Sequence, residues 1–202
     1  IRDLVRSRGL GDVYKRQTLA ETASIMCETI VTDAAIKMAE NPEEELAILE
    51  TALLGDSQVV VDIYSRYLFE SEVFKRREQA ELSADELNQI MESAQGEAYG
   101  DGLDPQYRQK YMWTWKPHYY YPGLAFYNYP YTFGLLFGTG LYAIYKQRGE
   151  SFVSEYKELL SLTGMGQAAD LAARFEIDIR SQAFWEGSLA LIGERVARYE
   201  AI

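Results

Sequence analysis

From Thr18 onward, apolar residues recur at the spacing of an α-helix, and this periodicity restricts the fold class more than any other feature. Thr18-Leu-Ala-Glu21 has the form of a capping box and predicts a first helix over residues 19–39. Asn41-Pro42 predicts a second helix start, with three glutamates beside the positive end of the helix dipole. We expect Gly55-Asp56 to break or bend this helix before a further long helix, which ends near Gln79.

The helical pattern continues to the C-terminus. A second capping box, Ser83-Ala-Asp-Glu86, opens a helix that ends near Tyr99, and a loop rich in glycine and proline follows at 100–105. Further helices are predicted near residues 133–145, 151–161, 167–175 and 181–199. The alternating run Tyr111–Trp115 is the only plausible strand. The sequence therefore predicts a mainly α fold of many helices.

Residues 117–145 form a stretch of 29 residues without a formally charged side chain. Pro122, Gly123 and Pro130 interrupt this stretch, and its uninterrupted apolar part, 133–145, is too short for a typical membrane span. Gly149 then supplies a usual helix C-terminus. A buried helix is the better interpretation, and we expect no membrane partner.

The net charge of −11 is unevenly distributed along the chain. Residues 1–17 carry a net charge of +3, whereas the remaining residues carry −14. Because the first segment also has only a weak apolar pattern, we interpret it as a non-native adaptor, with a native basic loop as the alternative. The acidic remainder argues against a nucleic-acid partner, since phosphate binding needs a basic patch.

The chain has one cysteine and one histidine. The single cysteine excludes an internal disulfide and a cysteine-rich metal site, which favours a reducing, cytoplasmic setting. We expect Cys27 simply to pack within its helix. A zinc enzyme normally supplies two or three imidazoles to its metal, so this chain is either no such enzyme or part of one.

Glu21 is the first candidate for a functional residue. It shares one face of an otherwise apolar helix with Ser24 and Glu28. A carboxylate on the inner face of a helix is costly unless it is paired or bound to a cation, which suggests a metal ligand or a buried acid. The alternative is that Glu21 only completes the capping box.

The second candidate is an aromatic run around His118. Residues 113–131 hold this histidine and six tyrosines beside a loop in which Gly123 would let the tyrosines move. A histidine surrounded by phenol groups can stabilise an oxyanion. The alternative is an aromatic core, because Tyr127 and Tyr131 have the spacing of one helix face.

Two long blocks of sequence resemble a known family. TLAETASIMCETI at 18–30 and WKPHYYYPGLAFYNYPYTFGLLFGTGLYAIY at 115–145 resemble the C-terminal catalytic region of oligoendopeptidase F, within the thimet oligopeptidase family of zinc metallopeptidases. YKELLSLTG at 156–164 and Phe184-Trp185 resemble the closing helices of that family. The resemblance covers residues 18–202 and implies a helical peptidase fold.

The resemblance also implies roles for single residues. In that family an HExxH helix supplies two histidine ligands to one zinc ion, and a glutamate on the next helix supplies the third ligand. The match to LAETAS places this third ligand at Glu21. The family's downstream histidine and tyrosines contact the substrate carbonyl and the oxyanion, which places these roles on His118 and on a tyrosine. Tyr129 is preferred because it follows the FYxY pattern, and Tyr127 and Tyr121 are the other candidates.

One departure from the family pattern concerns activity, because these 202 residues contain no HExxH motif. The resemblance therefore implies that residues 18–202 are the C-terminal helical part of a longer metalloendopeptidase that hydrolyses short peptides. We expect this chain to be inactive alone, since one glutamate cannot form a tight zinc site. We expect no obligate protein partner. The alternative is a non-catalytic helical interaction module or pseudo-enzyme that retains the peptidase fold.

Overall fold

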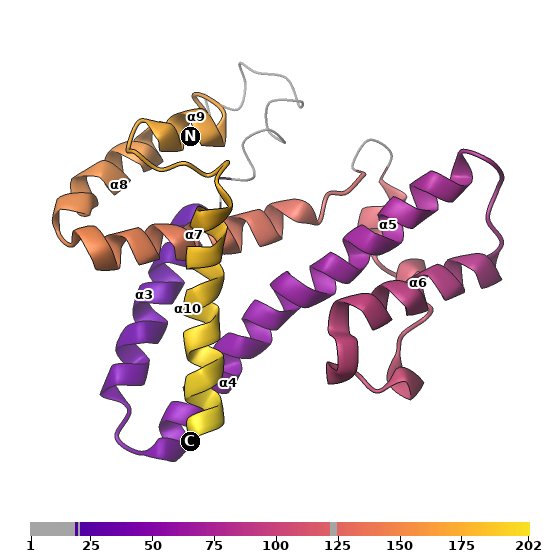
Figure 1. Cartoon of the computed structure of the whole chain (residues 1–202), viewed down its shortest axis with the longest axis horizontal. Coiled ribbons are helices and arrows are strands. Elements are labelled where there is room, and N and C mark those ends of the chain that lie inside the picture. Colours follow the sequence, from indigo (N-terminus) through magenta and orange to yellow (C-terminus); the bar gives the residue numbers. More distant parts are fainter. Residues whose placement is uncertain (1–18, 20, 122–124) are drawn as a thin grey trace. The chain divides into compact units, whose positions relative to one another are not determined.

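Figure 1 shows the computed structural model of the chain, which describes Leu19 and residues 21–121 and 125–202. All regular elements within these residues are helices, which confirms the predicted fold class. The chain divides into two compact units: the first combines residues up to Asp56 with Phe133–Ile202, and the second covers Ser57–Thr132. Residues 1–17, interpreted above as an adaptor, lie outside the described residues.

The first unit is built from helices around an aromatic core. Its helices are α3 (Thr22–Met38), α4 (Pro42–Ser57), α8 (Ser151–Ser161), α9 (Ala168–Ala173), α10 (Gln182–Ala201) and the part of α7 (Tyr129–Arg148) from Phe133 onward. Phe137, Leu141 and Phe152 are almost completely buried in this core. The charge-free stretch thus contains a buried helix, as predicted, and none of the described helices is long and apolar enough to cross a membrane.

Two glycines determine where α7 ends and how closely α3 packs against it. Gly149 has φ 66°, and its N–H donates to the Tyr145 carbonyl at 2.8 Å, which is the left-handed helix ending that favours glycine. A Cβ atom at Gly138 would lie 2.6 Å from Cγ2 of Ile25 on α3. The absence of a side chain at this position therefore allows the two helices to pack together.

The second unit is centred on two packed helices. After a π-helical turn, η1 (Gln58–Asp62), helices α5 (Ile63–Arg77) and α6 (Ala84–Tyr99) pack against each other. Four short 3-10 turns follow: η2 (Gly100–Gly102), η3 (Pro105–Tyr107), η4 (Met112–Thr114) and η5 (Pro117–Tyr120). Phe69, Ile90 and Met91 form the buried centre of this unit, and Trp113 packs against it.

The predicted capping box at the start of α6 is confirmed. The Ser83 hydroxyl accepts a hydrogen bond from the Glu86 N–H at 3.3 Å, and the Glu86 carboxylate accepts one from the Ser83 N–H at 2.8 Å. Thr18, the first residue of the other predicted capping box, lies outside the described residues. Glu21 occupies the N-cap position of α3, and among the described residues its side chain makes no capping hydrogen bond.

Three expectations about local structure are wrong. Tyr111–Trp115 is not a strand: Met112–Thr114 forms the 3-10 turn η4, and the Trp113 indole N–H donates to Asn88 Oδ1 on α6 at 2.9 Å. Helical structure also continues through Gly55, and the irregularity comes later, at the π turn. Cys27 is exposed, because the buried face of α3 is formed by Thr22, Met26 and Thr29.

Candidate functional site

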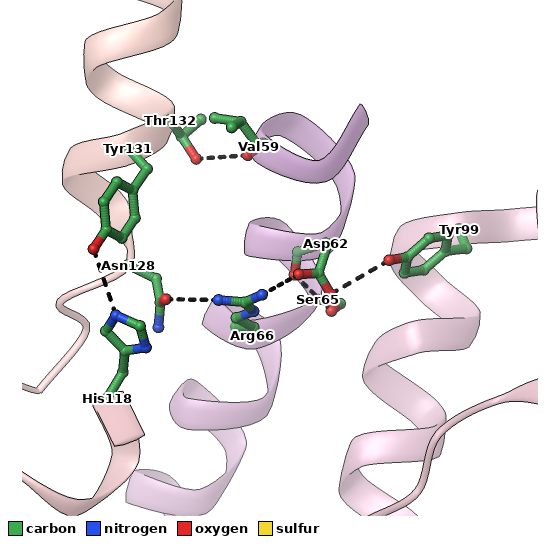
Figure 2. A network of polar contacts seen from close by, with 9 residues as sticks. All are labelled: Val59, Asp62, Ser65, Arg66, Tyr99, His118, Asn128, Tyr131 and Thr132. Carbon is green, nitrogen blue, oxygen red and sulfur yellow. Dashed lines mark hydrogen bonds and ion pairs between the residues drawn. The ribbon is translucent and has the colours of Figure 1, made fainter. Parts of the chain in front are cut away.

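His118 lies on the turn η5 and packs between two tyrosine rings. The Tyr127 ring is stacked on it, with ring centroids 5.8 Å apart and planes 20° apart. The Tyr131 ring meets it edge-on at 6.1 Å, and the Tyr131 hydroxyl and His118 Nε2 lie 3.5 Å apart, at the outer limit of a hydrogen bond (Figure 2). The second unit therefore brings an imidazole and two phenol groups together.

The surroundings of His118 favour its neutral form. Burial, followed by the positive charges of Arg66 and Lys116, lowers the pKa of His118 below its usual 6.5. Its Nδ1 atom is buried and has no hydrogen-bond partner among the described residues. A neutral imidazole carries one N–H donor and one acceptor nitrogen. At neutral pH this side chain can thus donate a hydrogen bond to a carbonyl oxygen.

A buried polar network lies beside His118 (Figure 2). The Arg66 guanidinium on α5 donates to Asn128 Oδ1 at 3.0 Å and pairs with the Asp62 carboxylate one turn earlier. Asp62 also accepts a hydrogen bond from the Tyr99 hydroxyl at 3.3 Å, and burial together with this carboxylate raises the pKa of Tyr99 to about 12. Arg66 and Asn128 thereby connect α5 to the segment that carries the tyrosines.

The predicted tyrosines occupy different environments. Tyr127 contacts His118, whereas the side chains of Tyr129 and Tyr121 are 54% and 58% exposed. Gly123, expected to let the tyrosines move, lies outside the described residues. Sequence reasoning missed Tyr131 as a site candidate, although its spacing from Tyr127 was apparent.

Glu21 belongs to the first unit and lies directly before α3. Its backbone carbonyl accepts hydrogen bonds from the Ile25 N–H at 3.0 Å and from the Ser24 hydroxyl at 2.9 Å. A Cβ atom at Gly134 of α7 would lie 2.8 Å from the Glu21 Cβ atom, so the glutamate side chain packs directly on this glycine. Glu21 is therefore held in place by α7 rather than by a capping role of its carboxylate.

The described residues do not fit a zinc ion by themselves. Zinc sites in enzymes use three protein ligands, mostly imidazole, thiolate and carboxylate. Within Leu19, 21–121 and 125–202, no three histidine, cysteine, aspartate or glutamate side chains are grouped so that they could hold a metal. Glu21 could contribute at most one ligand.

Comparison with known proteins identifies the fold. The chain superposes on the crystal structure of oligoendopeptidase-F from Enterococcus faecium with a TM-score of 0.78 over 94% of its residues, at 22% sequence identity. The fold is that of oligoendopeptidase F. The match covers 36% of that protein, so the chain spans about a third of its length. No protein-family model and no curated protein sequence matches the chain.

This likeness confirms the predicted peptidase-like fold and shows nothing about single residues. At 22% identity the two proteins share a backbone arrangement, whereas the chemistry of a site depends on the side chains that each protein carries. The His118, Tyr127 and Tyr131 cluster and the Arg66–Asn128 contact supply that chemistry in the second unit.

The lowered pKa of His118 predicts how stability depends on pH. Between the folded-state pKa and 6.5, the unfolded chain binds more protons than the folded chain. The contribution of His118 to the free energy of unfolding is therefore complete above pH 6.5. It decreases as the pH falls from 6.5 through the lower folded-state pKa. We expect the free energy of unfolding of wild type to fall relative to His118→Gln over that range in urea titrations. A constant difference between the two proteins would contradict the lowered pKa.

Proposed function

We propose that this chain forms part of a peptidase active site, in which the cluster around His118 binds the carbonyl group of a short peptide substrate. The observation that carries the proposal is the packing of the His118 ring against two tyrosine rings inside an oligoendopeptidase F fold. Tyr129, with its exposed side chain, is a further candidate for contact with the peptide. Tyr121 is also exposed and precedes Tyr129 by eight positions in the sequence.

Hydrogen-bond donors at these positions would favour peptide hydrolysis. When a nucleophile adds to the scissile carbonyl, negative charge develops on the carbonyl oxygen. Fixed donors aimed at this oxygen bind the transition state more tightly than the substrate, which is typically worth about 3–4 kcal/mol for one donor. His118 remains a neutral donor there, and the nearby positive charges of Arg66 and Lys116 favour the oxyanion.

Glu21 is proposed as one ligand of a zinc ion whose remaining ligands lie outside the described residues. Its sequence context and its position packed against Gly134 support this role. The described residues hold no complete zinc site. We therefore expect the 202-residue chain not to cleave an internally quenched fluorescent peptide, with or without added zinc, so that fluorescence should not increase. Zinc-dependent cleavage by the chain alone would contradict this division of the active site.

Peptide binding tests the proposal without requiring catalysis. We expect short unstructured peptides to bind the chain weakly and to shift the ring signals of its single histidine in NMR spectra. His118→Phe should weaken binding roughly two- to tenfold, the usual contribution of one hydrogen bond. Tyr107→Phe, at an exposed tyrosine on η3, is the matched control and should bind like wild type. Equal affinity of wild type and His118→Phe would favour a non-catalytic interaction module.

A further inference from the structure

Helix α5 carries two buried charged residues whose partners lie in a distant segment of the second unit. Arg66 and Glu70 are one helical turn apart, and their residues are 5% and 6% exposed. Arg66 donates to Asn128 Oδ1 at 3.0 Å, and the Glu70 carboxylate accepts a hydrogen bond from the Phe126 N–H at 2.9 Å. Both contacts fasten the segment 126–128, which leads into α7.

The backbone of this segment needs such contacts. Phe126 has φ 59°, in the left-handed region that bulky residues rarely adopt. A strained conformation of this kind persists only where the surrounding structure holds it. The Phe126 ring packs against Tyr67 and Phe74 of α5, at centroid distances of 5.7 and 5.3 Å. Helix α5 therefore holds both the ring and the backbone N–H of Phe126.

The fastened segment includes the residue that is stacked on His118. Tyr127 lies between Phe126 and Asn128, so the two contacts with α5 enclose it on both sides in sequence. Tyr131 follows one helical turn after Tyr127, and these two rings meet edge-on at 6.3 Å. Rotation of the backbone at Phe126 or Asn128 would move both tyrosine rings relative to His118.

We propose that Glu70 and Arg66 are positioning residues, which fix the segment 126–131 so that Tyr127 and Tyr131 face His118. Their catalytic importance rests on the function proposed above, whereas their effect on geometry does not. What the segment requires from position 70 is an acceptor oxygen that reaches the Phe126 N–H. Position 128 must likewise present an acceptor to the Arg66 guanidinium.

Glu70 variants of the full chain test this proposal through nuclear Overhauser contacts between the His118 ring and the rings of Tyr127 and Tyr131. Glu70→Gln keeps an acceptor of the same reach and should retain the contacts. Glu70→Met removes the acceptor, and Glu70→Asp keeps the charge but is one methylene shorter, so both should lose them. Glu72→Met, at a half-buried residue of the same helix that among the described residues pairs only with Arg76 and Lys75 of α5, is the matched control and should resemble wild type.

Asn128 variants test the second contact in the same way. Asn128→Asp keeps an acceptor for Arg66 and should retain the ring contacts, whereas Asn128→Leu should lose them. The Trp113 indole N–H signal, which reports on the bond to Asn88, should persist in every variant. Ring contacts that survive in both Glu70→Met and Asn128→Leu would overturn the proposal, as would their loss in Glu70→Gln. Failure of wild type to bind peptides would contradict the proposed function alone, because the ring contacts do not depend on it.

Discussion

Replacement of Arg66 by methionine is expected to lower the free energy of unfolding of the second unit by about 3–5 kcal/mol. The side chains of Arg66 and Asp62 are only 6% and 11% exposed, so the variant leaves the Asp62 carboxylate buried without its cation. Asn128 Oδ1 loses its donor at the same time. Urea denaturation followed through the Trp113 indole signal measures the loss, because this indole bonds to Asn88 within the second unit.

A double variant separates the charge effect from a packing effect. Replacing a buried ion pair by two apolar residues is often close to neutral, so Arg66→Met with Asp62→Leu should recover most of the lost stability. Arg76→Met, which breaks the exposed pair with Glu72, should cost at most about 1 kcal/mol. An Arg66→Met protein as stable as the Arg76→Met protein would contradict the buried network.

Replacement of Phe137 by alanine is expected to destabilise the first unit by about 3–5 kcal/mol. Phe137 is completely buried, and its ring packs against Phe133 and Phe184 at centroid distances of 5.5 and 5.8 Å. The variant loses these contacts and leaves a cavity that the surrounding helices fill only in part. The Trp185 indole, which donates to the Ile179 carbonyl at 2.9 Å, reports unfolding of this unit.

A matched control for Phe137→Ala is Leu54→Ala, at a residue of α4 that is 65% exposed. Substitutions at such exposed positions usually change stability by less than about 0.5 kcal/mol. Similar unfolding midpoints for the two variants would show that Phe137 does not belong to the core of the first unit.

Much of the fold could be predicted from sequence because the signals are local. The capping box at Ser83, the start of α4 at Pro42 and the ending at Gly149 each depend on neighbouring residues in the chain. The predicted helix over 151–161 agrees with α8. These helix starts and ends are found in the structure because the tertiary packing is compatible with the local preferences of the chain.

The wrong expectations concern segments whose conformation depends on distant residues. The alternation at Tyr111–Trp115 is typical of a strand, but the Trp113 side chain reaches Asn88 on α6 from a 3-10 turn. Cys27 lies on an apolar helix, yet only contact with other elements decides which face is buried. Periodicity alone could not distinguish these outcomes.

The candidate site was only partly accessible from sequence. The aromatic run pointed to His118 and Tyr127, and the spacing of Tyr127 and Tyr131 was equally compatible with a core. Arg66 and Glu70 gave no local signal, because their partners Asn128 and Phe126 lie 62 and 56 positions further along the chain. Such contacts depend on the tertiary structure, which packs α5 against residues 126–128.

The central claim is that the cluster around His118 recognises an oxyanion, and one comparison of two ligands tests it most directly. A phosphinic peptide carries a tetrahedral anion at the position of the scissile bond, and an otherwise identical peptide carries a neutral amide there. Calorimetry at neutral pH should show tighter binding of the phosphinic peptide to wild type, and this preference should become smaller in His118→Phe, where only the charges of Arg66 and Lys116 remain. Equal affinity of wild type for both peptides, or a preference of unchanged size in His118→Phe, would contradict the claim.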